Sequence, residues 1–204
     1  VSALSFFTVA AGAQLIVDPQ VRTKGQNFLC HTSQKTTEHE RLSGLMRDFL
    51  TKVGEVLEPK ELRGPVAIHL ENAYTRLRAT LPGAPPFADV VRVLKARLPR
   101  REIIVVNSTG SNATFGREMN FIVGGNILGR GLTIENLLVT YYLRRAKVSQ
   151  MDTMLQHARM FGYRAALMPF TRVFLPERLA LRFHNIHMAE PAAHGMRTLE
   201  AGQS

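Results

Sequence analysis

Short, almost wholly apolar runs constrain the fold of this chain more than any other feature of its sequence. Three of them cover residues 102–107, 119–124 and 137–142, and a shorter one covers 27–31. Runs of this length without polar alternation are typical of strands buried on both faces, as in parallel sheets. Helical periodicity between the runs then predicts an α/β fold, a parallel sheet flanked by helices.

The segments between these strands carry apolar residues at helical spacing. We predict helices at 3–17, from 36 onward, through 67–77, and at 87–98 and 149–161, a strand at 171–174, and a last helix beginning near Pro176-Glu177. The first helix is expected to lie in the core, and its lack of a basic start argues against a signal peptide. Asp18-Pro19 is expected to end it.

The helix that begins near residue 36 has a predicted cap and a predicted buried face. Thr36 or Thr37 is expected to cap its N-terminus, because a threonine hydroxyl accepts hydrogen bonds from the first backbone N–H groups. The residues expected to face the core are Leu42, Leu45, Met46, Phe49 and Val53.

Composition narrows the classes of protein that fit. With 204 residues and 45% hydrophobic content, the chain can bury a core, which excludes wholesale disorder. We expect one domain over 1–190 and a frayed tail over 191–204, and the initial Val1 suggests a fragment of a larger protein. No apolar run reaches about 18 residues, so we expect no membrane span and a cytoplasmic location.

The single cysteine, Cys30, excludes a disulfide framework, and its apolar strand predicts an inert, buried thiol.

The charge balance is strongly basic. Lys and Arg number 26 against 16 Asp and Glu, so the net charge is 26 − 16 = +10. This favours a nucleic-acid partner, because Lys and Arg supply most non-specific affinity for phosphates, although a solvated basic surface is the alternative. The clusters Arg76/Arg78 and Arg97/Arg100/Arg101 fit either interpretation.

A glycine-rich segment, 124–134, directly follows a predicted strand. It holds four glycines, which allow backbone N–H groups to approach a phosphate closely. Ligands of open α/β sheets bind beyond the carboxyl ends of the strands, where such loops lie. The alternative is a tight connection that merely needs positive φ angles.

A second segment, 156–164, combines a core-facing stripe with a polar face. On the predicted helix, Asp152, Gln156, Arg159 and Tyr163 fall on one polar face, beside a stripe of Met151, Met154, Leu155, Ala158 and Phe161. A glutamine and two arginines at a helix end can present guanidinium groups to a phosphate. A solvated helix face is the alternative.

Together, the two segments resemble motifs V and VI of superfamily 2 helicases. The first corresponds to Arg130-Gly131-Leu132-Thr133-Ile134, and the second to the Gln-x-x-Arg element that carries the arginine finger. A closer resemblance is to the Z-one endonuclease domain family, carried by the runs 123–133 and 156–164, with Tyr141-Tyr142-Leu143-Arg144 and Asp152-Thr153 between them. Upstream, Phe28-Leu29-Cys30-His31-Thr32-Ser33 and Asn107-Ser108 are similar to strand ends of that family. The departures are Gly129, Ala158 and Met160, where the family tends to have Ser, Gly and Trp.

The resemblance covers roughly 1–175 and implies a three-layer RecA-like lobe, the second of two that sandwich ATP. It implies catalytic roles for Arg159, Arg164 and Gln156 near the γ-phosphate, and nucleotide contacts for Gly129, Arg130, Gly131 and Thr133. It also implies nucleic-acid contacts for His31, Thr32, Ser33, Asn107, Ser108, Gly125 and Asn126.

Several motifs are missing from the sequence. There is no Gly-x4-Gly-Lys-Ser/Thr motif and no Asp-Glu pair at a strand end to hold magnesium. ATP and Mg²⁺ are therefore expected to be shared with a first ATPase lobe, upstream in the parent chain or on a partner, and the chain alone is not expected to hydrolyse ATP. We expect no metal site of its own, since His184, His187 and His194 have the spacing of surface histidines. Nuclease residues are also lacking, since no carboxylate pair is followed by Glu-x-Lys on a strand. Glu58-Pro59-Lys60 has the letters of that element, but its proline argues against a strand interior.

The leading hypothesis is therefore the second motor lobe of a nucleic-acid-dependent ATPase in a restriction or defence-type protein, with DNA as the favoured partner. A degenerate lobe that binds nucleic acid or a partner without supporting hydrolysis is the second hypothesis. A free-standing nuclease is the third.

Overall fold

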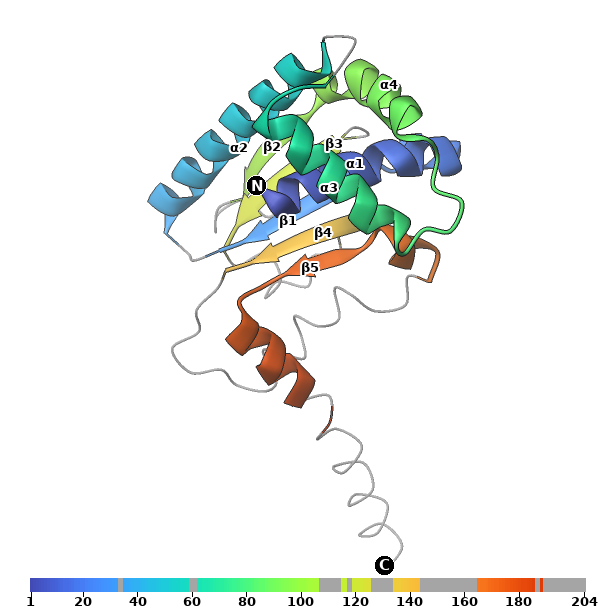
Figure 1. The fold of residues 1–204 in the computed structure, drawn as a ribbon. Coiled ribbons are helices and arrows are strands. Elements are labelled where there is room, and N and C mark those ends of the chain that lie inside the picture. Colours follow the sequence, from blue (N-terminus) through green and yellow to red (C-terminus); the bar gives the residue numbers. More distant parts are fainter. Residues whose placement is uncertain are drawn as a thin grey trace, which may run out of the picture.

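In the part of the chain that the structure describes, the protein is an α/β structure built on five parallel strands. The computed structural model describes residues 1–32, 35–58, 62–106, 115–116, 119–125, 134–143, 165–185 and 188. Across the sheet the strands follow the order β2 (Glu102–Val106), β3 (Met119–Gly124), β1 (Gln26–His31), β4 (Leu137–Tyr142) and β5 (Arg172–Phe174), and every neighbouring pair is parallel (Figure 1). The predicted parallel sheet and its five strands are confirmed.

The three central strands are the most buried. All residues of β1 and β3 are buried, and β4 has a single partly exposed residue, whereas β2 and β5 at the edges are more exposed. Because successive side chains point to opposite faces, Phe28 and Phe121 lie on one face, and Leu29 and Ile122 on the other. Apolar residues on both faces explain why these runs show no polar alternation.

Helices of the described residues cover one face of the sheet in two tiers (Figure 1). They are α1 (Ser2–Val17), α2 (Thr36–Leu57), α3 (Pro65–Arg78) and α4 (Phe87–Arg97). Helix α1 packs on β4 and β1, and α2 packs on β2 and β3, while α3 and α4 pack on α1. Short 3-10 turns occupy Pro19–Thr23, Leu98–Arg100 and Ala165–Phe170, and residues 177–185 form a helix on the other side of the sheet, as expected from Pro176-Glu177.

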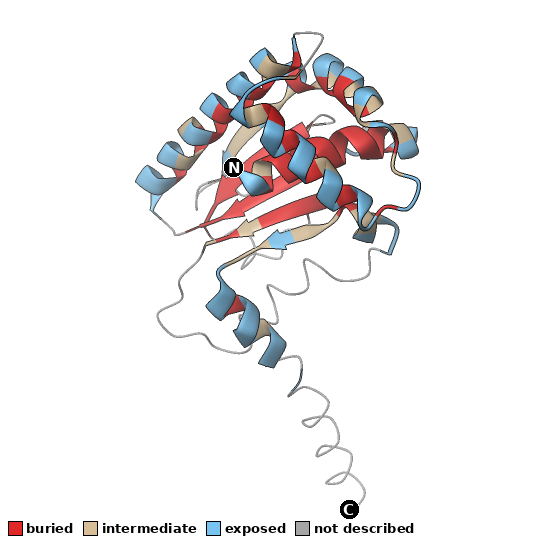
Figure 2. Cartoon of the chain, viewed as in Figure 1, coloured by how far each residue is buried: buried red, intermediate tan, exposed pale blue. Residues whose placement is uncertain are grey.

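Helix α1 is a core helix, as its sequence predicts. It is enclosed between the sheet and α3 and α4, and most of its residues are buried (Figure 2). A helix that is apolar all round needs such an enclosed position. It ends where predicted, because Pro19 follows it and the Asp18 side chain accepts a hydrogen bond from the Gln20 backbone N–H.

Close packing of α1 against α4 depends on Gly12. A Cβ added there would lie 3.1 Å from side-chain atoms of Leu94 and Val90. We expect Gly12→Val to lower the free energy of unfolding by about 1–3 kcal/mol through overpacking. Urea unfolding measures the change. Gly54→Ala on α2 is the matched control, since nothing lies within 4 Å of its added Cβ. It should raise stability by up to about 1 kcal/mol, and equal losses in the two variants would contradict the packing argument.

The main core contains a cluster of three buried phenylalanines from three elements. The ring centroid of Phe7 lies 5.0 Å from that of Phe121 and 5.7 Å from that of Phe28. Tilted and edge-on aromatic pairs of this kind stabilise a core beyond their buried area. The cluster thus joins α1 to the two central strands β1 and β3.

A buried amide network lies at the amino edge of the sheet, where the strands begin. Gln14 donates to the Asn136 side-chain oxygen (2.9 Å), Gln26 donates to the Ala11 carbonyl (2.8 Å), and Asn120 donates to the Asn27 side-chain oxygen (3.0 Å). Buried amides need such partners because an unsatisfied polar group in the core is costly. The network connects α1 to β1, β3 and the residue before β4, which supports the alignment of these elements.

Two details predicted for α2 are wrong. The residue that precedes the helix is Lys35, whose side chain does not cap it, and the threonines instead occupy its first turn. Leu45 was expected in the core but is 56% exposed, because the buried stripe passes through Ser43, Met46 and Leu50. The predicted helix 149–161 and the tail 191–204 lie outside the described residues.

Candidate functional site

The carboxyl edge of the sheet, where the strands end, brings together two segments far apart in sequence. His31 at the end of β1 lies in register with Gly124 at the end of β3. The Thr32 backbone N–H donates to the Gly124 carbonyl (3.2 Å), and the Leu143 N–H donates to the His31 carbonyl (2.8 Å). The strand ends of β3, β1 and β4 therefore form one connected edge.

The adjacent ends of β1 and β3 form a switch point in the sheet. After β1 the chain continues into α2, which packs on the face that α1 covers. After Gly125, the next described residue is Ile134, which packs with Leu29 and Ile122 on the opposite face. In open α/β sheets, ligands bind beyond the carboxyl ends of neighbouring strands whose connections lie on opposite faces.

His31 is enclosed at this edge rather than exposed. Its side chain is fully buried, and its ring centroid lies 4.9 Å from that of Tyr142, which in turn meets Phe183 edge-on at 6.2 Å. Thr32 is also buried, at 3% exposure. The predicted contact of these two residues with nucleic acid is untested and stays a prediction.

Cys30, which precedes His31, is buried as expected. Burial raises the pKa of its thiol to about 12. At pH 8 only about one thiol in ten thousand is then ionised, and the thiolate is the reactive form. We expect no reaction with an aromatic disulfide reagent in the native protein and one equivalent per chain after unfolding in urea. Rapid labelling of the native protein would show that β1 opens readily.

Most of the predicted site residues lie outside the described part of the chain. They are Gln156, Arg159 and Arg164 among the catalytic candidates, Gly129, Arg130, Gly131 and Thr133 among the nucleotide contacts, and Ser33, Asn107, Ser108 and Asn126 among the nucleic-acid contacts. The described members are His31, Thr32 and Gly125, and all three lie at the carboxyl edge. The roles predicted for all of these residues stay predictions.

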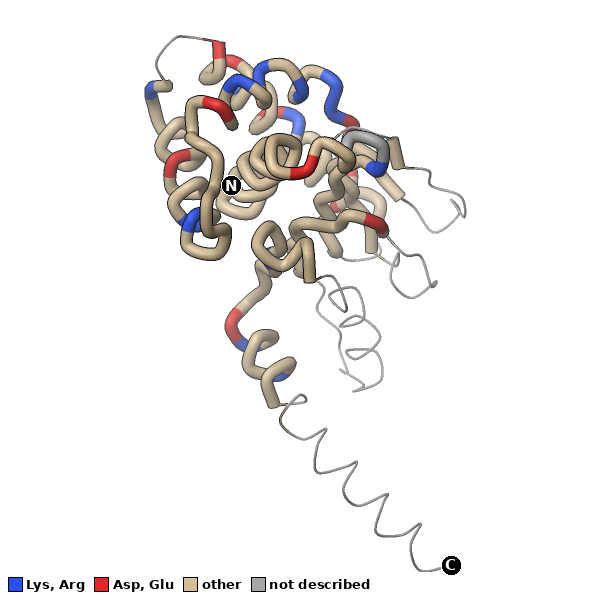
Figure 3. Tube along the Cα trace, turned by 90° about the vertical axis from the view of Figure 1, so that its right-hand side faces the viewer, with Lys and Arg blue, Asp and Glu red and all other residues tan. Residues whose placement is uncertain are grey.

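The cluster Arg97/Arg100/Arg101, whose sequence fits either nucleic-acid contacts or a solvated surface, lies away from the carboxyl edge. Arg97 ends α4, and Arg100 and Arg101 directly precede β2, so they belong to the amino edge. Burial lowers the pKa of Arg101, which donates to the Leu98 carbonyl (3.1 Å) at the end of a helical turn. Figure 3 shows Lys and Arg interspersed with Asp and Glu along the described helices. The cluster therefore fits helix termination, since cations stabilise helix C-termini, rather than the carboxyl-edge site.

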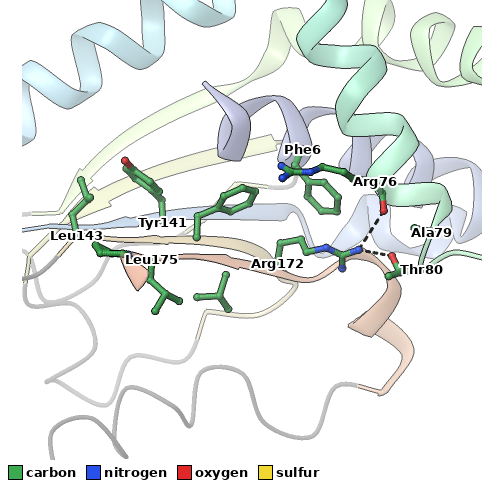
Figure 4. Close-up of a pocket in the computed structure, with 11 residues that line it drawn as sticks. Phe6, Arg76, Ala79, Thr80, Tyr141, Leu143, Arg172 and Leu175 are labelled. Carbon is green, nitrogen blue, oxygen red and sulfur yellow. Dashed lines mark hydrogen bonds between the residues drawn. The ribbon is translucent and has the colours of Figure 1, made fainter. Parts of the chain in front are cut away.

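A groove beside β5 was not predicted. It has a volume of about 690 Å³, and Arg76 and Arg172 line it together with aromatic side chains (Figure 4). The sequence names Arg76 only as part of a cluster and offers no sign of Arg172. The two residues are 96 positions apart, and only the packing of α3 beside the sheet brings them together.

Metal ligation and membrane crossing can be judged for the described residues. Within them, no group of three His, Cys, Asp or Glu side chains could hold a metal ion. In the same part of the chain, none of the helices has the length and apolar character needed to cross a membrane.

Comparison with known proteins adds a family assignment. The sequence profile of the Z1 domain matches residues 1–197, nearly the whole chain. No curated protein and no solved structure shows significant similarity to the sequence.

Proposed function

We propose that this chain, which belongs to the Z1 domain family, is the second, RecA-like motor lobe of a nucleic-acid-dependent ATPase. The described fold is compatible with such a lobe, because it has a five-stranded parallel sheet with helices packed on it. The two helicase-like segments, 124–134 and 156–164, give the remaining support. They follow β3 and β4, two of the three strands whose ends form the connected carboxyl edge.

The observation that carries the proposal is the juxtaposition of His31 and Gly124 at the switch point. The glycine-rich segment continues directly from Gly124-Gly125, so it departs from the position where open α/β sheets bind ligands. The alternative is that these glycines serve only a tight connection after β3.

The charge of the two segments supports phosphate binding. Residues 124–134 and 156–164 contain three Arg and no Asp or Glu, so their net charge is +3. In the proposed mechanism, Arg159 and Arg164 offset the charge that builds up on the γ-phosphate during transfer, and Gln156 assists them. Arg130 and Thr133 contact the nucleotide and couple it to the nucleic acid.

ATP and Mg²⁺ are proposed to be held mainly by another lobe. The chain lacks the phosphate-cradling motif with its lysine, and it lacks an Asp-Glu pair at a strand end. Its own part in hydrolysis is then to supply arginines to the nucleotide held by that lobe. Duplex DNA is the favoured nucleic acid, in a restriction or defence-type protein.

The direct test is ATP hydrolysis by the whole protein with and without duplex DNA. We expect turnover that DNA stimulates. DNA binding without any turnover would instead support the second hypothesis, a degenerate lobe, which the departures at Gly129 and Ala158 bring into consideration. Cleavage of DNA by this chain alone would contradict both and favour a nuclease.

A further inference from the structure

The groove beside β5 lies on the same face of the sheet as α1, but along its edge. Its walls come from the first turns of α1, the end of α3, the end of β4, and β5 with the residues that follow it (Figure 4). The side chains that matter for its chemistry are Phe6, Arg76, Thr80, Tyr141, Arg172 and Phe174. A volume of about 690 Å³ falls within the usual range for small-molecule sites, about 300–1,000 Å³.

Arg172 is held firmly at one end of this groove. Its guanidinium donates to the carbonyls of Thr171 (2.7 Å) and Arg76 (3.5 Å) and to the Thr80 hydroxyl (2.5 Å). Its central carbon also lies 4.8 Å from the ring centroid of Phe6. A guanidinium has five N–H donors, so two are left without a partner among the described residues.

Arg76 places a second positive charge at the same end. Within the described residues, no carboxylate forms an ion pair with Arg76 or Arg172. The pKa of Arg172 is lowered, first by burial and second by the charge of Arg76. Two neighbouring cations without an anion are a destabilising arrangement that a bound anion would relieve.

The rest of the groove is apolar and partly aromatic. Phe174 lies against Phe6, with ring centroids 6.4 Å apart, and Tyr141 stands on β4 toward the other end (Figure 4). Planar apolar molecules pack well against aromatic walls. A ligand that uses both features needs a flat apolar body and one anionic group.

We propose that this groove binds a small molecule with an aromatic body and a single carboxylate or phosphate, which the guanidinium groups of Arg76 and Arg172 contact. The planar donor fork of arginine matches both anions in shape and charge. The groove lies beside the edge strand β5, whereas the switch point lies between β1 and β3. The groove therefore does not lie at the switch point, although it reaches the carboxyl end of β4 at Leu143, and its test does not depend on ATP hydrolysis.

Calorimetric titration of the purified protein with 2-naphthoate and 2-naphthyl phosphate tests the proposal. We expect saturable binding of one equivalent for at least one of the two probes. The neutral 2-naphthamide should bind about tenfold more weakly, because it lacks the charge that the guanidinium groups contact. Arg76→Gln should lower the affinity for the anionic probe about tenfold and leave the affinity for 2-naphthamide unchanged.

Two surface variants provide the controls. Arg78→Gln removes the same charge from the same turn of α3 but does not line the groove, so it should leave both affinities unchanged. Ala79→Phe places a ring in the groove from an exposed position and should abolish binding of every probe. Equal affinities for anionic and neutral probes, equal effects of Arg76→Gln and Arg78→Gln, undiminished binding to Ala79→Phe, or no saturable binding would each overturn the proposal.

Discussion

Replacing Arg164 by alanine in the whole protein is expected to abolish DNA-stimulated ATP hydrolysis. If Arg164 offsets the charge that develops on the γ-phosphate, its loss should lower the turnover number by about 10³–10⁵-fold, as for arginine fingers in other nucleotide hydrolases. The affinity for duplex DNA should change little, because that contact is proposed for other residues. Steady-state hydrolysis and a DNA-binding titration at fixed salt measure the two quantities.

The matched control for this substitution is Arg78→Ala. Arg78 is an exposed arginine in the last turn of α3, remote from the carboxyl edge, and its removal changes the net charge by the same amount. Turnover should stay within about twofold of wild type, since surface changes of this kind alter stability little. Full activity of the Arg164→Ala variant would refute the arginine-finger assignment. Joint loss of turnover and DNA binding would indicate that Arg164 serves the nucleic acid or the fold.

The largest effect on stability is expected for Phe121→Ala. Phe121 is fully buried on β3, and its ring meets those of Phe7 and Phe28. Truncation removes buried apolar surface and leaves a cavity between a helix and two central strands. We expect a loss of about 3–5 kcal/mol in the free energy of unfolding. Urea titration followed by circular dichroism measures it.

Val105→Ala on the neighbouring strand β2 separates packing from strand propensity. Val105 is 36% exposed at the edge of the sheet, so its truncation should cost about 1 kcal/mol or less. A similar loss for the two variants would argue against a central role for the three-ring cluster. A third variant, Phe121→Leu, keeps most of the apolar volume and should recover much of the stability.

Much of the fold could be predicted because hydrophobic periodicity is a local property. The runs at 119–124 and 137–142 coincide with β3 and β4, and the helix through 67–77 lies within α3. The errors arose where local preference competes with packing. Leu45 has the right residue type for a core position, but the direction in which α2 meets the sheet leaves it in solvent.

The candidate site could be predicted in part for the same reason. A glycine-rich segment after a strand indicates where the carboxyl edge lies, and Gly124-Gly125 do lie there. The burial of His31 agrees with the buried strand predicted at 27–31, but its ring contact with Tyr142 and the neighbouring Phe183 could not be foreseen, because these residues lie far along the chain. The buried amides Gln14 and Asn136 were missed for the same reason, although a glutamine within an apolar helix is a signal that such a partner exists.

The sequence by itself determined the α/β class, the order of helices and strands, and the two segments on which the motor proposal rests. These follow from periodicity and from motifs whose residues are close together in the chain. Only the tertiary structure decided the strand order, the contact between His31 and Gly124, and the meeting of Arg76 and Arg172 beside β5. Those features depend on packing between elements far apart in sequence, since burial energy depends on which surfaces meet rather than on local pattern.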